Sequence, residues 1–309
     1  MNKVLLTGSE GFIGRSLIAS GLIDIKYCVD TTDGLLSLSS AENTDSPQQV
    51  GFTEFNKHLP NDITHILHFG AITSTIFTNE EKIELFNTSM TNSLVDFSCK
   101  NGVNLIFASS ASIYANHPTM SEHLTLPKPN NLYAKSKWNS ERYISLRCEC
   151  KDSHITVLRL FNIFGKLEER KGSMSSIIWR FINDAIKHRK IVIFEREGHS
   201  LGSQSRDFVF VEDLIRFVKI LIDKNEGVGT LNFGTGFSHT FNEIAELVAS
   251  KFTGLEIKST ELPTEFSTNY QWYTKSDTFN FRQRYPDFIF TPFATAFQDI
   301  YQYCLGRQN

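Results

Sequence analysis

Tyr133 and Lys137 form the one Tyr-x-x-x-Lys pair in the chain, a spacing that suits acid–base chemistry. On a helix, side chains four residues apart lie on the same face. A free tyrosine has a pKa of about 10, which a neighbouring ammonium and a positively charged nicotinamide ring both lower. The phenolate can then remove a hydroxyl proton while a hydride leaves the same carbon for the cofactor. Because the chain has nine tyrosines, such a pair also arises by chance, and its placement has to support it.

Ser110 follows the apolar run 105–109 and is a second candidate for this chemistry. Parallel α/β sheets bind their ligands at the carboxyl ends of the strands. A hydroxyl at such an end can hydrogen-bond the reacting oxygen of a substrate. The alternative is a serine in an ordinary strand-to-loop turn, and the other motifs decide in favour of the catalytic role.

A glycine triplet directly follows the first apolar run, 4–6, and opens a helix. In this position Gly8 allows a tight turn, Gly11 lets the backbone approach a pyrophosphate, and Gly14 lets the helix pack against the strand. The N–H groups at the start of the helix then face the phosphates. The sequence therefore predicts a dinucleotide-binding turn, whose candidate residues are Gly8, Gly11, Phe12, Ile13 and Gly14.

Asp30 comes sixteen residues after Gly14, at the end of the expected second strand. A carboxylate in this position can bind the ribose hydroxyls of a dinucleotide, and an acidic turn residue is the alternative. The next residues, Thr31, Thr32 and Asp33, include no Lys or Arg that would pair with a 2′-phosphate. Both NAD and NADP remain candidate cofactors, and NAD is favoured, since Arg15 in the first turn of the helix is more simply explained as a solvated residue.

The elements that would position these residues alternate between strand-like and helix-like patterns, which is typical of a parallel sheet with helices on both faces. We therefore predict an α/β fold, a Rossmann doubly wound parallel sheet with a smaller C-terminal substrate-binding lobe. Polar stretches at 39–49 and 195–205 are expected loops. The expected strands are 4–6, 25–29, 63–69, 103–108, 155–161, 191–194, 207–211 and 230–233, and the expected helices are 11–20, 80–100, 131–147, 173–188, 212–223 and 241–252.

The alternation of strand-like and helix-like segments changes after Gly165, which suggests a division of the chain. We predict a dinucleotide-binding domain over 1–165 and a mainly substrate-binding lobe over 166–309. The segment 207–234 is expected to return to the main sheet and complete it.

Composition narrows the function classes further. The chain has 309 residues and a formal net charge of −3, which favours no nucleic-acid partner. Apolar runs fall short of the about 18 residues that a membrane helix requires, and we expect neither a membrane association nor a secretory signal. The five cysteines predict reduced thiols in a cytoplasmic protein. His65 and His68 are expected on opposite faces of a strand, and no metal site is predicted.

These motifs occur in the order and spacing of the extended short-chain dehydrogenase/reductases, a family of NAD(P)-dependent epimerases and dehydratases that the chain resembles. The segments 159–165 (RLFNIFG) and 206–211 (RDFVFV) resemble two further segments of that family. The resemblance implies an enzyme in which Ser110, Tyr133 and Lys137 are catalytic. It also implies that Lys137 contacts the cofactor, together with Gly70, Ala71, Asn87 and Ile163.

Within that class, three short stretches are similar to the ADP-glyceromanno-heptose 6-epimerases: 70–75 (GAITST), 171–176 (KGSMSS) and 270–274 (YQWYT). This resemblance implies transient oxidation of a side-chain carbon of a nucleotide-diphosphate sugar, with hydride returned to the opposite face and Lys171 as the second proton-transfer group. It implies a homo-oligomer as well. The residues that it places against the substrate are Ser110, Asn162, Ser173, Arg206 and Tyr270.

Other functions stay open. A 4-epimerase or 4-keto reductase of a UDP-, dTDP- or GDP-hexose would share Ser110, Tyr133 and Lys137 without needing Lys171. A dehydratase is disfavoured because Ala111 and Ser112, not an acidic pair, follow the serine. A regulator that binds cofactor without catalysis is a further alternative. The chain also departs from the heptose epimerases in a longer loop after 194–196 and a shorter region between the second and fourth strands.

Overall fold

The computed structural model describes residues 2–32, 35–40, 43–50, 55–147, 155–195, 198, 200–225, 227–262 and 270–307. Its largest sheet has the strand order β11-β7-β6-β5-β1-β2-β3-β4. The bounds of these strands are β1 (Val4–Thr7), β2 (Ile25–Thr32), β3 (Leu35–Ser40), β4 (Asn43–Val50), β5 (His65–His68), β6 (Asn104–Ser110), β7 (Ile155–Leu160) and β11 (Gly229–Phe233).

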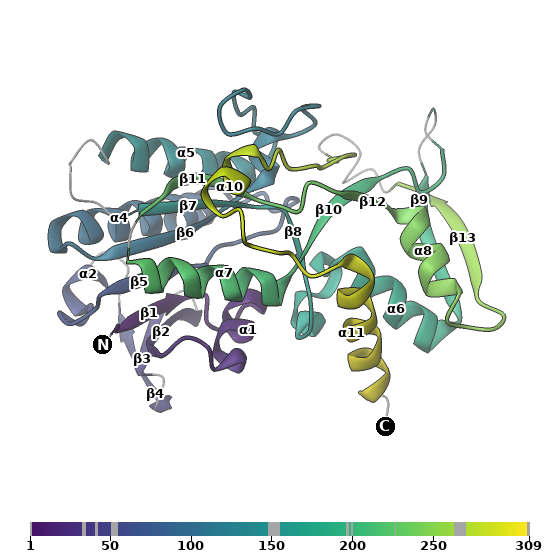
Figure 1. Cartoon of the computed structure of the whole chain (residues 1–309). Coiled ribbons are helices and arrows are strands. Elements are labelled where there is room, and N and C mark those ends of the chain that lie inside the picture. The colour runs from purple at the N-terminus through teal and green to yellow at the C-terminus, as the bar shows by residue number, and fades with distance from the viewer. Residues whose placement is uncertain are drawn as a thin grey trace. The chain divides into compact units, whose positions relative to one another are not determined.

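The centre of this sheet is parallel, with β1 paired to both β2 and β5 and β5 paired to β6. All the residues of β1 and β5 are buried, as expected for strands covered on both faces. Figure 1 shows the covering helices, with α4 and α5 above the sheet and α1 and α7 below it. Their bounds are α1 (Phe12–Ser20), α4 (Met90–Asn101), α5 (Leu132–Arg147) and α7 (Val211–Lys224). The predicted Rossmann-type α/β fold is confirmed.

Shorter helical segments connect these elements: α2 (Phe55–His58), α3 (Glu80–Ile83), the π-helical η2 (Glu84–Ser89) and the 3₁₀-helical η3 (Ala111–Tyr114). The expected single helix 80–100 is thus α3, η2 and α4 in succession, because η2 widens the turn in the middle.

The loop predicted over 39–49 is wrong. In its place β3 and β4 form an antiparallel hairpin that extends the sheet beyond β2. Leu36 and Leu38 of β3 are buried, so the strand does alternate, but its serines made the segment look like a loop. Strand β2 also continues past Asp30 to Thr32.

The chain divides into two compact units, residues 1–113, 129–159 and 214–231, and residues 114–128, 160–213 and 232–309, and each is described by itself. The boundary predicted at 165 stays a prediction. The second unit contains β8 (Asn162–Phe164), β9 (Lys190–Glu195), β10 (Ser205–Phe210), β12 (Ser238–Thr240), β13 (Glu256–Glu261), the 3₁₀-helical η4 (Glu168–Met174), α6 (Ile177–His188), α8 (Phe241–Ala249), α10 (Phe279–Arg284) and α11 (Phe293–Gly306).

The strands of the second unit form two small sheets, β12-β10-β8 and β13-β9. The expectation that 207–211 returns to the main sheet is therefore wrong, and only β11 of the segment 207–234 joins it. β10 instead pairs in parallel with β8 and antiparallel with β12. These two short strands satisfy the backbone hydrogen-bonding groups of β10. The helix expected over 173–188 begins at Ile177, because the Ser176 side chain caps it there.

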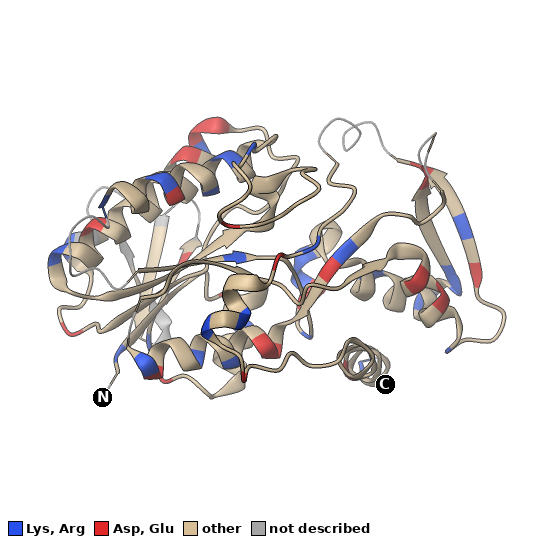
Figure 2. Ribbon diagram, turned by 45° about the horizontal axis from the view of Figure 1, so that its top comes forward, with Lys and Arg blue, Asp and Glu red and all other residues tan. Residues whose placement is uncertain are grey.

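Aromatic side chains fill the core of the second unit. The ring of Phe233 packs against Phe281, Phe288 and Phe290, with centroid distances of 5.4–6.2 Å. Charged residues of both signs are interspersed over the described helices, in keeping with the small net charge (Figure 2). In the described part of the chain, every helix is too short or too polar to span a bilayer.

Candidate active site

The glycine turn between β1 and α1 has the tight geometry that the sequence predicts. Gly8 has a positive φ of 75°, and a Cβ there would lie 2.7 Å from the backbone of Gly70. A Cβ on Gly14 would lie 2.0 Å from the carbonyl oxygen of Gly8. Two of the glycines are thus required by backbone packing within the turn itself.

Gly11 is different, because a Cβ there would make one close contact, at 3.2 Å from the Gly8 oxygen. Gly11 is the N-cap of α1 and caps it with no side chain. Side-chain caps normally satisfy the first N–H groups of a helix. A small N-cap residue and an uncapped first turn, which includes Phe12 and Ile13, fit the phosphate groups of a dinucleotide.

Asp30 lies against this turn. Its Oδ2 accepts a hydrogen bond from the backbone N–H of Glu10 at 2.6 Å, and its Oδ1 accepts one from Thr31 at 2.8 Å. Burial raises the pKa of the Asp30 carboxyl, and the two N–H bonds oppose that rise. The carboxylate therefore holds the glycine turn in shape, and the predicted binding of ribose hydroxyls by its remaining lone pairs stays a prediction. Asp33, part of the argument against NADP, lies outside the described residues.

Ser110, Tyr133 and Lys137 come together in the first unit. Asn131 caps the N-terminus of α5, its Oδ1 accepting the N–H of Ala134 at 2.8 Å, so Tyr133 and Lys137 lie one turn apart near the start of this helix. The side chains of Tyr133 and Ser110 are hydrogen-bonded. The Lys137 ammonium is buried, 5.9 Å from the centroid of the Tyr133 ring and 4.7 Å from that of Phe107.

Burial is the largest cause of the pKa shifts of Tyr133 and Lys137. It raises the pKa of Tyr133, and the hydrogen bond with Ser110 opposes that rise. It lowers the pKa of Lys137 to about 7, against the charge of Glu141. We expected Lys137 to lower the phenol pKa, but within the protein chain desolvation outweighs this effect. Lys137 is thus an unusually acidic amine, a perturbation typical of functional sites.

Glu141, whose charge acts on Lys137, is paired with Arg159, and neither residue was predicted as part of the site. Two nitrogens of Arg159 donate to the Glu141 carboxylate at 2.7–3.1 Å, and both side chains are at most 5% exposed. The Ser109 hydroxyl donates to the same carboxylate. The spacing of four between Lys137 and Glu141 on one helix was the available signal.

The loop after β5, which holds Gly70 and Ala71, is fixed by Asn87. The Asn87 side chain accepts from the N–H of Ile72 at 2.8 Å and donates to its carbonyl at 2.9 Å and to the Ser136 hydroxyl at 3.0 Å. Since these contacts engage both ends of the amide, Asn87 orders the loop predicted to bind cofactor. Ser136 also donates to the carbonyl of Tyr133, which links this loop to α5.

In the second unit, Arg206 and Tyr270 come together. The Arg206 guanidinium lies 5.5 Å from the centroid of Tyr270 and 5.4 Å from that of Phe241. It donates to the carbonyls of Ser205 and Trp272 at 2.9 and 3.1 Å. Burial lowers the pKa of Arg206, opposed by Tyr270. Arg206 is therefore no solvated surface charge, and its other N–H groups include donors for an anionic ligand.

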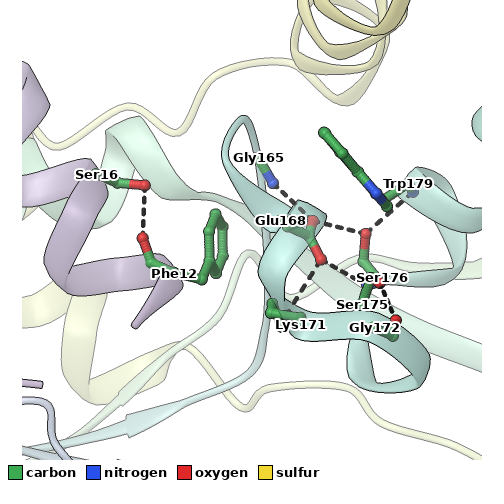
Figure 3. A network of polar contacts seen from close by, with 9 residues as sticks. All are labelled: Phe12, Ser16, Gly165, Glu168, Lys171, Gly172, Ser175, Ser176 and Trp179. Carbon is green, nitrogen blue, oxygen red and sulfur yellow. Dashed lines mark hydrogen bonds and ion pairs between the residues drawn. The ribbon is translucent and has the colours of Figure 1, made fainter. Parts of the chain in front are cut away.

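The other predicted residues of this unit lie on separate elements. Asn162 begins β8 and accepts from the Thr274 hydroxyl at 2.9 Å, while Ile163 is buried and pairs with Val209 of β10. Lys171 and Ser173 lie in η4, where Ser173 is exposed and Lys171 forms an ion pair with Glu168 at 3.2 Å (Figure 3). No local sequence signal marked Glu168 as part of this site.

Comparison with known proteins defines the class to which this fold and site belong. The model of the NAD-dependent epimerase/dehydratase family matches residues 4–234, and the chain belongs to that family. The predicted resemblance is thereby confirmed.

A more particular similarity covers nearly the whole chain. The ADP-L-glycero-D-manno-heptose-6-epimerase of Alkalilimnicola ehrlichii is 28% identical over 303 residues, which cover 95% of this chain and 94% of that protein.

Two solved structures share the fold. The ADP-L-glycero-D-manno-heptose-6-epimerase of Helicobacter pylori has a TM-score of 0.78 at 18% identity, covering 98% of this chain and 96% of that one. The UDP-glucose 4-epimerase of Thermus thermophilus, solved with NAD, has a TM-score of 0.76 at 21% identity, covering 98% and 99%. At these identities the structures establish the fold alone.

Proposed function

We propose that the protein is a nucleotide-sugar epimerase that transiently oxidises and re-reduces its substrate with a bound NAD(P), and that the substrate is an ADP-glyceromanno-heptose inverted at C6. The observation that carries the proposal is the grouping of Ser110, Tyr133 and Lys137 on β6 and α5. The similarity to a heptose epimerase over nearly the whole chain supports the choice of sugar.

The three side chains divide the proton chemistry on one face of the sugar. Tyr133 takes the proton from the reacting hydroxyl as a phenolate and returns it as a phenol. Ser110 donates a hydrogen bond to the same substrate oxygen. The Lys137 ammonium stabilises the phenolate by its charge, and Glu141 keeps that ammonium from losing its proton too readily.

Reversible hydride transfer is the chemistry that the nicotinamide supplies when bound. In the first unit, the residues proposed to hold the dinucleotide lie on the glycine turn, β2, the loop after β5, η2 and α5, and the proposed residue of the second unit is Ile163 of β8. We favour NAD because Asp30 offers a carboxylate and Thr31 no positive charge for a 2′-phosphate. The proposed set is Gly8, Gly11, Phe12, Ile13, Gly14, Asp30, Gly70, Ala71, Asn87, Lys137 and Ile163.

Lys171 is proposed to exchange the proton on the opposite face. Arg206 is proposed to bind the diphosphate, since a buried guanidinium is a strong partner for phosphate oxygens. Asn162, Ser173 and Tyr270 complete the proposed substrate contacts.

The test is to incubate the purified protein with each C6 epimer of ADP-heptose and follow the sugar by NMR. Interconversion of the two epimers with no net consumption of cofactor is the expected result, and Tyr133→Phe should abolish it. The nucleotide released on denaturation identifies NAD or NADP. Turnover of a UDP-, dTDP- or GDP-hexose instead, with both heptoses inert, would replace the proposal by a 4-epimerase or 4-keto reductase.

A further inference from the structure

We propose that Glu168 is a positioning residue for Lys171, a buried carboxylate that holds the Lys171 ammonium in one place. The inference rests on the proposed function, in which Lys171 exchanges the second proton. It concerns one short segment of the second unit, from the end of β8 through η4 to the start of α6 (Figure 3).

The Glu168 side chain is fully buried, and both of its oxygens are engaged. Oε1 accepts from the N–H of Gly165 at 3.1 Å and from the Ser176 hydroxyl at 2.8 Å. Oε2 accepts from the N–H of Ser176 at 2.6 Å and from the Lys171 ammonium at 3.2 Å. Three of these donors are uncharged and the fourth is the ammonium. A buried carboxylate needs such partners, so its position is closely determined.

The carboxylate is anchored to a packed helix. Ser176 is the N-cap of α6, and its Oγ accepts from the N–H of Trp179 at 3.2 Å. Ile178 and Trp179 at the start of that helix are buried. The Glu168 carboxylate is thus hydrogen-bonded to the N-cap of α6 as well as to Lys171. These bonds fix its position, and the carboxylate in turn fixes the position of the Lys171 ammonium.

The turn that carries Lys171 is closed on its other side as well. The Ser175 backbone N–H donates to the carbonyl of Gly172 at 3.1 Å, and the Ser175 hydroxyl donates to the same oxygen. Lys171 therefore lies between two hydrogen-bonded positions of the segment, with Glu168 before it and Gly172 after it.

Burial of the two partners is unequal, and this inequality argues for a role beyond stability. The Lys171 side chain is 25% exposed, whereas Glu168 is 0% exposed. An ion pair whose lysine still reaches solvent contributes little to folding by itself. A different role fits this arrangement better. The buried carboxylate fixes the orientation of the Lys171 ammonium, and the ammonium can still contact a ligand from solvent.

The experiment compares Glu168→Gln with Lys171→Met and, as a matched control, Glu169→Gln. Glu169 lies in the same turn and is ion-paired with Arg307 at 3.6 Å. The kcat and KM of the holoenzyme are measured for ADP-heptose interconversion. Separately, the rate at which an amine-reactive ester modifies Lys171 is measured by mass spectrometry, a readout that needs neither substrate nor turnover.

For Glu168→Gln we expect kcat to fall about 10-fold to 100-fold with little change in KM, since a misplaced group slows the reaction more than it weakens binding. Without the carboxylate the Lys171 side chain loses its ion pair and is no longer held in place, so acylation of Lys171 should quicken about tenfold. Glu168→Asp, whose shorter side chain holds Lys171 less well, should quicken acylation by a smaller factor. Glu169→Gln should match the wild type.

A merely structural Glu168 would give another pattern. Glu168→Gln would then lower the melting temperature while its kcat and Lys171 acylation stayed those of the wild type, and the proposal would be overturned. Should Glu168→Gln fail to fold, unchanged acylation of Lys171 in Glu168→Asp, whose carboxylate is drawn back by one carbon, would overturn it too. A wild-type protein inert towards both heptoses would sink the proposed function, yet the acylation rates would still test the contact between Glu168 and Lys171.

Discussion

The imidazole of His68 lies between two hydroxyls, with Nε2 2.9 Å from Thr91 and Nδ1 2.6 Å from Thr7. The Thr91 hydroxyl donates to the carbonyl of Asn87 at 2.5 Å, so it accepts from Nε2–H. Thr7 in turn donates to Nδ1 and accepts from the N–H of Gly70 at 3.1 Å. A neutral histidine of one tautomer, protonated on Nε2, therefore links β1, through Thr7, to η2 and α4 through Asn87 and Thr91.

Protonation of His68 should destabilise the fold in mild acid. Burial lowers its pKa from 6.5 to about 3, and the charge of Lys137 acts in the same direction. Between these values the unfolded chain binds the extra proton, so stability falls as the pH drops below 6.5. From pH 7.5 to 5.5 this residue should remove about 1.4 kcal/mol of unfolding free energy. Denaturant titrations of wild type and His68→Gln measure it.

The control for that measurement is His188→Gln, at an exposed position in α6. It should leave the pH dependence as in the wild type. An equal pH dependence in wild type and His68→Gln would contradict the prediction.

Gly14→Ala and Gly11→Ala should separate folding from cofactor binding. A Cβ at position 14 would lie 2.0 Å from the Gly8 oxygen, so helix α1 must shift, at a cost of about 1–3 kcal/mol in unfolding free energy. At position 11 the contact is 3.2 Å, and we expect a smaller loss of stability but a clear loss of dinucleotide affinity. Thermal unfolding and calorimetric titration distinguish the two effects, and equal losses of stability would contradict the argument.

Lys137→Met should make the protein more stable while abolishing turnover. Burial lowers the pKa of Lys137 from 10.5 to about 7, so the unfolded chain holds the proton more tightly between those values. The wild type therefore gains stability as the pH rises through that window. The variant should gain about 4 kcal/mol at pH 7 and only about 1 kcal/mol near pH 10. Urea titrations at both pH values check this result, and a destabilised variant would show that the ammonium is favourably paired.

Arg206→Lys should raise the KM for the nucleotide sugar by about 10-fold to 100-fold, because lysine cannot reproduce the planar, forked guanidinium between Tyr270 and Phe241. The kcat should change less, since the diphosphate is remote from the reacting carbon. Steady-state kinetics measures both. Arg180→Lys, which alters another arginine of the same unit, is the comparison; a KM unchanged in Arg206→Lys would remove the proposed diphosphate contact.

Much of the first unit could be predicted because its signals are local. The continuous apolar strands, the glycine turn and the pair Tyr133 and Lys137 each depend on spacing along the chain, and spacing survives folding. The hairpin of β3 and β4 was missed since an edge strand needs little apolar sequence, and among the side chains that the structure describes there, Leu36 and Leu38 are the buried apolar ones.

The missed site residues share another cause. Glu141 and Glu168 are carboxylates in charged surroundings that read as solvated side chains, yet both are buried. Glu141 is paired with Arg159 from the next strand, and Glu168 is paired with Lys171 and accepts hydrogen bonds from N–H groups eight residues away or fewer. An acidic side chain can be buried only where the fold places hydrogen-bond donors around it. The sequence near the acid does not indicate those donors.

The bond between Asp30 and the N–H of Glu10 bears on any attempt to redesign cofactor choice. Replacing this aspartate, the obvious first step towards accepting a 2′-phosphate, would also withdraw an acceptor from the loop that must cradle the diphosphate. Exposed Thr31 is the safer place to introduce a basic group, because its side chain takes no part in that support.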